Sequence, residues 1–236
     1  MDHLTLLALD TSTEACSVAL YYKGEKTAIN ELAQRTHTQR ILPMVDDILA
    51  QSGIRLSQLD ALAFGRGPGS FTGVRVGCSV AQGLALGADL PVLPISNLTA
   101  MAQAAFEQYQ VEQVAAAIDA RMDEVYFCRL QRQKVRSNLG AFFDWLPIVP
   151  EQVCSPSQAL AQMGSGEDFL VGTGWRAYEL FSQHGKKGSE IELPCALSML
   201  PLAINDWQQG KAISALEIEP VYLRNTVTWK KLPGRE

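Results

Sequence analysis

Two aspartates that follow predicted strands are the clearest candidates for binding chemistry. Asp10 comes directly after an apolar run, and a hydroxyl-rich turn with Thr11 and Ser12 follows it. Asp119 also ends an apolar run and precedes a polar turn and a returning strand. Because open sheets bind ligands beyond the carboxyl ends of their strands, two such turns facing a cleft could hold the phosphates of a nucleotide. The simpler alternative is that each aspartate caps its own turn through the backbone.

A glycine pair, Gly172 and Gly174, is a weaker candidate for nucleotide binding. It follows a short apolar run that predicts a strand at residues 169–171. Backbone without side chains can approach an adenine or a ribose closely. Two glycines alone do not specify such a ligand.

The run at residues 65–77, G-R-G-P-G-S-F-T-G-V-R-V-G, resembles a phosphate loop at first sight. Neither standard pattern fits, because no Lys follows the glycines and Thr72 stands where the third Gly of G-x-G-x-x-G belongs. The composition instead predicts a rigid turn that leads into a helix, with Ser70 or Thr72 as the capping residue.

The helix after this turn has a face of small residues. Gly73, Gly77, Ala81 and Ala85 recur every fourth position and therefore share one face. Each Gly costs about 0.5–1 kcal/mol relative to Ala within a helix, so close approach of another helix is the expected reason. That helix could belong to the same chain or to a partner protein.

Catalytic and metal-binding arrangements are not recognisable in the sequence. A metal-binding His pair on one helical face needs four-residue spacing, but Ile41 stands four positions after His37. No Ser-His-Asp or Cys-His arrangement and no G-x-S-x-G element can be assembled. We therefore expect no catalytic residue and no metal site.

Composition predicts an ordinary globular protein. The 236 residues are 47% hydrophobic and 19% charged, with a formal net charge of −5, which does not favour broad nucleic-acid binding by the chain alone. Five scattered cysteines without a C-x-x-C pattern suit a reducing compartment. We expect a cytoplasmic protein with no membrane segment and no leader peptide.

The predicted elements form two α/β halves that open in the same way. Each half starts with a strand, an Asp, a polar turn and a returning strand, which places a boundary near residues 105–112. We expect an N-terminal lobe at 1–108 and a smaller, less regular C-terminal lobe at 109–236. The expected strands are 4–9, 15–22 and a third after it, 61–64, 90–95, 114–118, 125–130, 169–171 and 220–224; the expected helices are 36–52, 73–88, 98–109, one containing Tyr178, and 198–209; residues 226–236 are expected to fray.

Several stretches resemble the TsaB (YeaZ) family of bacterial proteins, which are required for threonylcarbamoyladenosine formation in tRNA. The most specific is the run from residue 65 to 77, and the others lie at 9–19, 37–43, 118–122, 172–178 and 220–224. The resemblance implies a two-lobed actin/hexokinase-like (ribonuclease H-like) α/β fold. Each lobe would be a mixed sheet with flanking helices.

The resemblance also implies a division of labour. The catalytic sibling TsaD transfers a threonylcarbamoyl group to the adenosine beside the anticodon and holds a metal with two His residues four positions apart. Because His37 and Ile41 occupy the matching positions here, the resemblance implies a non-catalytic subunit. It would bind TsaD, with the ATPase TsaE completing the assembly, would meet tRNA indirectly through the complex, and would form a homodimer when alone. No cofactor is implied for the chain itself, with ATP or ADP binding only at the complex interface.

The resemblance places the partner face on the helices at 38–52 and 73–87, which would form a four-helix contact around a pseudo-twofold axis. On this interpretation Gly77→Arg or Val80→Glu abolishes pairing without unfolding the chain. A nucleotide-binding ATPase or small-molecule kinase that uses Asp10 and Asp119 is the alternative. The expected partner-binding residues are His37, Ile41, Leu42, Val45, Gly73, Val76, Gly77, Val80, Ala81 and Leu84.

Overall fold

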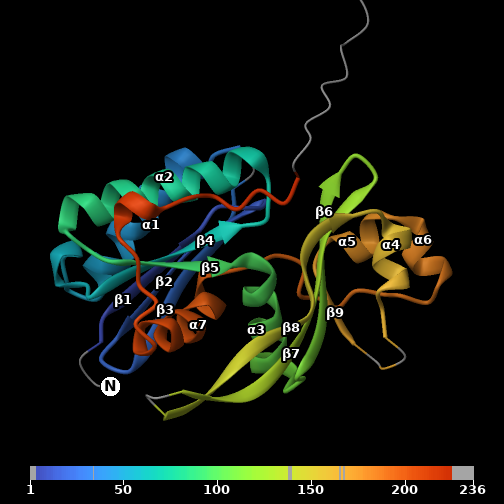
Figure 1. Ribbon diagram of the computed structural model, residues 1–236. Coiled ribbons are helices and arrows are strands. Elements are labelled where there is room, and N and C mark those ends of the chain that lie inside the picture. The colour runs from blue at the N-terminus through green and yellow to red at the C-terminus, as the bar shows by residue number, and fades with distance from the viewer. Residues whose placement is uncertain (1–3, 34, 138–139, 165, 167, 225–236) are drawn as a thin grey trace, which may run out of the picture.

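Two mixed sheets form the framework of the molecule in the computed structural model, which describes residues 4–33, 35–137, 140–164, 166 and 168–224 (Figure 1). The strand orders are β3-β2-β1-β4-β5 and β8-β7-β6-β9. In both sheets an antiparallel meander is extended by a strand parallel to its first strand. The strands are β1 (Leu6–Asp10), β2 (Ala15–Tyr22), β3 (Glu25–Leu32), β4 (Ala61–Gly67), β5 (Val92–Ser96), β6 (Gln113–Arg121), β7 (Glu124–Ser137), β8 (Gly140–Cys154) and β9 (Phe169–Val171).

The helices fill three layers around the two sheets. One pair covers the outer face of the first sheet, a second pair lies between the sheets, and three short helices cover the outer face of the second sheet (Figure 1). The pair on the first sheet is α1 (His37–Gln51) and α2 (Phe71–Ala88), and the pair between the sheets is α3 (Asn97–Tyr109) and α7 (Ala196–Gln208). The three short helices are α4 (Pro156–Ala161), α5 (Gly174–Ala177) and α6 (Glu179–Gln183). Two 3-10 turns are η1 (Leu56–Gln58) and η2 (Ala215–Glu217).

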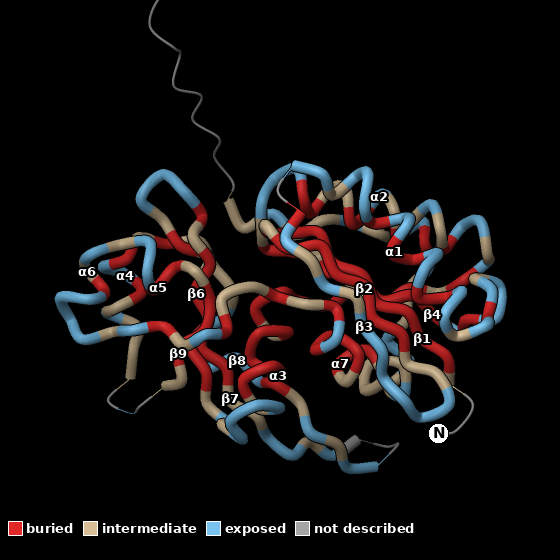
Figure 2. The backbone as a smooth tube through the Cα atoms, turned by 180° about the vertical axis from the view of Figure 1, so that it is seen from behind, coloured by how far each residue is buried: buried red, intermediate tan, exposed pale blue. Residues whose placement is uncertain are grey.

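The strands are buried because both faces of each sheet are covered. In β1, Leu7 and Leu9 face the cluster with α1 and α2, whereas Leu6 and Ala8 face the cluster with α3 and α7. Successive side chains of a strand point to opposite faces, so an unbroken apolar run is what a doubly covered strand requires. Figure 2 shows β1, β2, β4 and β6 as largely buried, with exposed residues on the outer sides of α1 and α2.

The sheets separate near the predicted boundary, but the end of the chain returns to the first sheet. α7 packs its buried residues with those of β1, β4 and β5, and Val92 forms an antiparallel bridge with Ile213. The prediction of a lobe at 109–236 is therefore wrong for α7 and for residues 211–224, which we call the C-terminal strap. We use "first lobe" and "second lobe" for the two sheets with their covering helices.

Most predicted elements are confirmed, with local corrections. β4 continues through Gly67, beyond the predicted end at residue 64, and Asp119 lies within β6. β8 was not predicted at all. Residues 220–224 form no strand, although the N–H of Val221 donates to the carbonyl oxygen of Arg66 at 2.9 Å. The predicted fraying of residues 226–236 lies outside the described residues.

The caps of α2 and α3 are the hydroxyl residues that precede them. Ser70 Oγ accepts a hydrogen bond from the N–H of Gly73 at 3.1 Å, so Ser70 caps α2 and Thr72 does not. Ser96 Oγ accepts from the N–H of Thr99 at 3.2 Å and caps α3. Each cap satisfies an N–H group that the first helical turn leaves without a partner.

Candidate functional site

A cleft of about 760 Å³ lies between the two lobes. Its walls come from the β1–β2 turn, the segment before α1, the turn before α2, the β6–β7 hairpin and the end of the strap. This volume lies within the range of ordinary small-molecule sites. The lining residues are Ser12, Thr13, Glu14, Arg35, His37, Gly69, Ser70, Phe71, Ile118, Asp119, Ala120, Arg121, Tyr126, Thr173, Ala177 and Arg224.

Asp10 does not line this cleft, because it is buried in a polar network beneath it. Ser12 Oγ donates to Asp10 Oδ2 at 3.0 Å and Asn97 Nδ2 donates to Asp10 Oδ1 at 3.2 Å. Asn97 Oδ1 in turn accepts from the N–H of Gly67 at 3.2 Å. A side chain at Gly65 would overlap the Asp10 carboxylate, which explains the glycine there. The network joins β1, β4 and α3.

Burial also changes the acidity of Asp10. The side chain is 1% exposed. Loss of hydration raises its pKa from 3.8 to about 6, against the hydrogen bonds from Ser12 and Asn97, which favour the carboxylate. A carboxylate so enclosed has no accessible edge for a ligand, so the predicted nucleotide contact at Asp10 is corrected to a structural one.

Thr11 and the two glycines after β9 also have structural reasons. Thr11 is 1% exposed, and its hydroxyl donates to the carbonyl oxygen of Gly73 at 2.7 Å. Gly172 has φ +102°, and a Cβ there would overlap the carbonyl of Ala117. At Gly174 a Cβ would lie 2.9 Å from that carbonyl oxygen. These glycines allow the turn before α5 to press against β6.

Asp119 reaches the cleft from a turn with an unusual backbone. Arg121, Met122 and Asp123 have φ values of 62°, 57° and 59°, a left-handed conformation that L residues rarely adopt. The N–H of Arg121 donates to Asp119 Oδ1 at 2.9 Å, and the Arg121 guanidinium pairs with Asp119 Oδ2 at 2.9 Å. Arg121 also lies 3.9 Å from Glu14 across the cleft.

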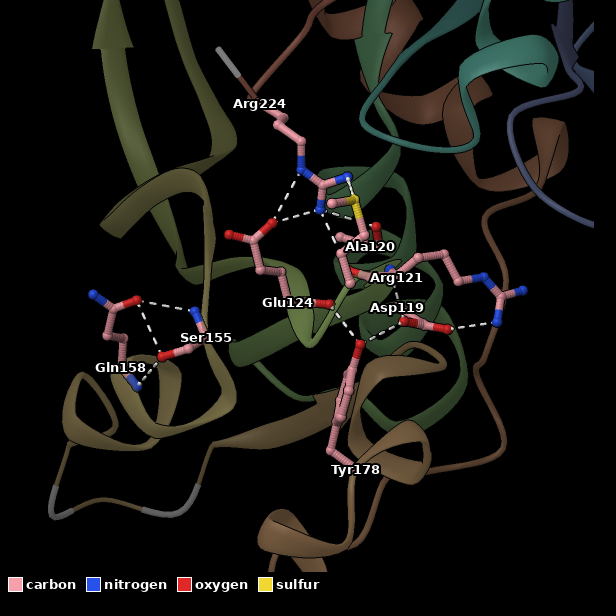
Figure 3. A network of polar contacts seen from close by, with 9 residues as sticks. Asp119, Ala120, Arg121, Glu124, Ser155, Gln158, Tyr178 and Arg224 are labelled. Atoms are coloured by element: carbon pink, nitrogen blue, oxygen red, sulfur yellow. Dashed lines mark hydrogen bonds and ion pairs between the residues drawn. The ribbon is translucent and has the colours of Figure 1, made fainter. Parts of the chain in front are cut away.

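Two further side chains hold this β6–β7 turn (Figure 3). Tyr178 Oη lies 2.9 Å from Asp119 Oδ1 and 3.0 Å from the carbonyl oxygen of Glu124. Burial, and then the hydrogen bond to Asp119 and its charge, raise the pKa of the Tyr178 phenol to about 12. Arg224 donates to Glu124 Oε2 at 3.0 Å and to the carbonyl oxygen of Ala120 at 3.1 Å. The turn is thereby tied both to the helical layer and to the strap.

Of the predicted nucleotide-binding residues, Ser12 and Asp119 line the cleft. Sequence reasoning did not select Arg35, Arg121, Thr173 or Arg224 as site residues. Asn97, which binds the Asp10 carboxylate, was not among the predicted site residues either. Thr173 lies between Gly172 and Gly174, and Arg224 is the last residue of the stretch 220–224 that resembles the family. The sequence patterns that could have identified these two residues therefore lay next to them.

The predicted partner face is only partly accessible. Ile41, Val45, Gly73, Gly77 and Ala81 are buried within the chain itself. They are therefore corrected to core residues, which contribute no accessible side-chain surface. Leu42 is 45% exposed, and the side chains that remain half-buried are those of His37, Val76, Val80 and Leu84.

The small face of α2 packs against the first lobe and not against a partner. A Cβ at Gly73 would overlap the carbonyl oxygen of Thr11, and one at Gly77 would lie 3.0 Å from Thr11 Oγ1. Gly77→Arg would therefore disturb folding, contrary to the prediction that it leaves the chain folded. His37 is held differently, because its Nε2 donates to the carbonyl oxygen of Thr13 at 2.8 Å.

Within the described residues, no group of three or more His, Cys, Asp or Glu side chains is placed to hold a metal ion. Over the same part of the chain, none of the helices is both long and apolar enough to span a membrane.

Two lobes that share a four-strand order, to which β5 adds a fifth strand in the first, with helices on each sheet and a cleft between them define a protein of the actin/hexokinase-like class. Residues 26–196 match the family described as TsaD, tRNA N6-adenosine threonylcarbamoyltransferase. The chain is 70% identical over 236 residues to the tRNA threonylcarbamoyladenosine biosynthesis protein TsaB of Haemophilus influenzae, covering 100% of both chains. It is 50% identical over 236 residues to the protein of that name from Escherichia coli, covering 99% of this chain and 100% of that one.

A solved structure agrees with these relatives. YeaZ from Pseudomonas aeruginosa superimposes with a TM-score of 0.81 at 41% identity, covering 92% of this chain and 100% of that one. The chain belongs to the TsaB (YeaZ) family, as the sequence resemblance indicated.

Proposed function

We propose that this chain is a non-catalytic subunit in the cytoplasmic formation of threonylcarbamoyladenosine in tRNA. It binds the threonylcarbamoyltransferase TsaD through the outer sides of α1 and α2, and the ATPase TsaE completes the assembly. In the absence of TsaD, the same surface pairs two copies of the chain. ATP or ADP binds only in the assembled complex.

The observation that carries this proposal is an uncovered apolar strip on α1 and α2. Leu42 on α1 is 45% exposed, and Val80 and Leu84, one turn apart on α2, are half-buried. α1 and α2 pack side by side on the same face of the first sheet. Apolar side chains gathered on adjacent helices are typical of protein–protein contacts.

Two glycines make close approach to this strip possible. Gly83 and Gly87 lie one helical turn apart on α2, and nothing lies within 4 Å of a Cβ built at either position. A partner helix can therefore approach the backbone of α2 there. This second small pair, unlike the buried face at Gly73 and Gly77, supports the proposed contact.

The non-catalytic role is supported by the start of α1. The side chain of Ile41, which occupies the position of the second His of the catalytic family members, is fully buried. The imidazole of His37 is engaged with the backbone of Thr13. An apolar side chain cannot donate electrons to a metal ion, so this helix lacks one of the two ligands that the resemblance implies for TsaD.

The test is binding of purified TsaD by a Val80→Glu variant. A carboxylate at this half-buried site would have to be desolvated in the complex, and we expect at least a tenfold weaker association. Size-exclusion chromatography and calorimetry measure it, with thermal unfolding as the check that the chain is folded.

The matched control is Ile148→Glu on the edge strand β8. Ile148 is 45% exposed and lies in the second lobe, so the control should bind TsaD as the unmodified chain does. Normal binding by Val80→Glu would exclude the proposed face. Full tRNA modification in a reconstitution that omits this chain would exclude the proposed role.

A further inference from the structure

An arginine packs against two exposed aromatic rings, one of which, Phe71, lines the cleft. The guanidinium carbon of Arg75 lies 3.2 Å from the ring centroid of Phe71 and 4.7 Å from that of Tyr222. The two rings are 6.4 Å apart and inclined by 36°. Phe71 is 66% exposed and Tyr222 47% exposed, so planar faces remain open to solvent.

Hydrogen bonds hold the Arg75 side chain and the backbone on both sides of Tyr222. Arg75 Nη1 donates to the carbonyl oxygen of Phe71 at 3.0 Å, within the first turn of α2. Tyr222 lies on the strap between two attachments. One is the hydrogen bond of Val221 to the first lobe, and the other is the set of contacts of Arg224 with the β6–β7 turn, which Figure 3 shows. Because Arg75 packs against both rings in the free protein, a ligand that stacks here loses less side-chain entropy than one that must first gather the three groups.

The charge near the stack is not balanced. Among the described residues, neither Arg75 nor Arg35 has a carboxylate oxygen within 4.0 Å, whereas Arg121 and Arg224 at the same cleft do. Arg35 and Phe71 line the cleft together. Open aromatic faces beside unpaired guanidinium groups fit an anionic ligand with flat rings.

We propose that Phe71, Arg75 and Tyr222 form a stacking platform for an unpaired base of the tRNA substrate, with Arg35 toward the adjoining phosphates. Proteins bind single-stranded RNA by stacking its bases on aromatic and Arg planes and by neutralising its backbone with basic residues. Aromatic residues and Arg also gather at protein interfaces, but the unpaired positive charge favours RNA here. The inference rests on the proposed function, which makes tRNA the substrate of the complex.

The platform and the proposed TsaD face lie on opposite flanks of α2. Val80 follows Phe71 by nine positions, which turns it about 180° around the helix axis. The strap lies along the platform side, where Gln82 Nε2 donates to the carbonyl oxygen of Ala215 at 3.0 Å. TsaD bound through Val80 therefore leaves the platform open to RNA.

The test compares tRNA binding by the complete complex of this chain, TsaD and TsaE. The probes are a full-length tRNA with adenosine beside the anticodon and its isolated anticodon stem-loop, followed by fluorescence anisotropy. We expect the double variant Phe71→Ala/Tyr222→Ala to bind both probes at least tenfold more weakly. Arg75→Lys, which keeps the charge and loses the planar group, should show a smaller loss.

The control is Phe143→Ala, because Phe143 is also an exposed ring beneath an arginine, 4.1 Å from the Arg132 guanidinium carbon, on the hairpin of β7 and β8. It should bind tRNA normally.

If the double variant assembles with TsaD and binds tRNA normally, the platform inference is overturned and the proposed function stands. If it loses TsaD instead, the platform is a protein contact and the RNA inference is overturned. If the unmodified chain forms no complex with TsaD, the proposed function and this inference fail together.

Discussion

Asp10 is a carboxyl group placed where its negative charge is disfavoured. It is 1% exposed at the end of β1, and its pKa is raised from 3.8 to about 6. The hydrogen bonds from Ser12 and Asn97 offset only part of the lost hydration. The role of the Asp10 side chain is to join β1 to α3 beneath the cleft.

This burial makes stability depend on pH. Below pH 3.8 the carboxyl group is protonated in both folded and unfolded chains. As the pH rises through about 6, the unfolded chain has already released the proton, so the buried charge costs the fold about 3 kcal/mol. The Asp10→Asn side chain cannot ionise. We therefore expect the free energy of unfolding of this variant, relative to that of the unmodified chain, to rise by about 2–3 kcal/mol from pH 4.5 to pH 7.5. Urea unfolding across this range measures the difference; parallel profiles would contradict it.

At the scale of the element, α2 uses its glycines in two ways. Gly73 and Gly77 sit where a side chain would meet Thr11 of the β1–β2 turn. Gly83 and Gly87 have open space around them. The same four-residue spacing therefore serves intramolecular packing on one face and an uncovered surface on another.

The two glycine types predict opposite effects of alanine. Gly73→Ala should lower the free energy of unfolding by about 1–3 kcal/mol, because its Cβ overlaps the Thr11 carbonyl oxygen. Gly83→Ala should raise it by about 0.5–1 kcal/mol through helix propensity alone. Equilibrium unfolding of both variants checks the pair, and a stabilised Gly73→Ala would show that the close contact is relaxed.

Elements with a clear period could be predicted, and those without one could not. The apolar runs of β1 and β4 and the helical stripe of α1 were sufficient. In β8 the apolar and polar residues alternate irregularly, and the strand contains Pro147 and Pro150. It is an edge strand that pairs with β7 with register shifts. Prolines argue against a central strand but are tolerated at such an edge.

At the scale of the molecule, the strap fastens one lobe to the other. Val221 is bonded to β4 in the first lobe, and three residues later Arg224 is bonded to the β6–β7 turn in the second. A further link across the lobes is the ion pair of Arg66 with Glu151 at 3.0 Å.

Removing the Arg224 side chain should loosen the turn it holds. Arg224→Ala breaks the bonds to Glu124 and Ala120, and we expect roughly tenfold faster amide hydrogen exchange at residues 120–125. Exchange in β1 and β2 should not change. Arg136→Ala, an exposed arginine at the far end of β7, is the control. Unchanged exchange at the turn would show that the strap does not support it.

The site was the hardest part to predict because its contacts join distant parts of the chain. Asp10 meets Asn97 across 87 residues, and Arg224 meets Glu124 across 100. Local patterns located the two hairpins and identified Ser12 and Asp119, but they could not show which side chains the fold would bury. For that reason Asp10 and the buried half of the expected partner face were misassigned.

The position of α7 has a consequence for how the protein is made on the ribosome. Strands β1, β4 and β5 are translated early, yet one of their faces is covered by a helix that begins only at Ala196. A nascent chain that ends before this point leaves the part of that apolar face beneath α7 open to water. We therefore infer that the first lobe matures late in synthesis, and that a truncated translation product is a substrate for chaperones and proteases instead of a working half-protein.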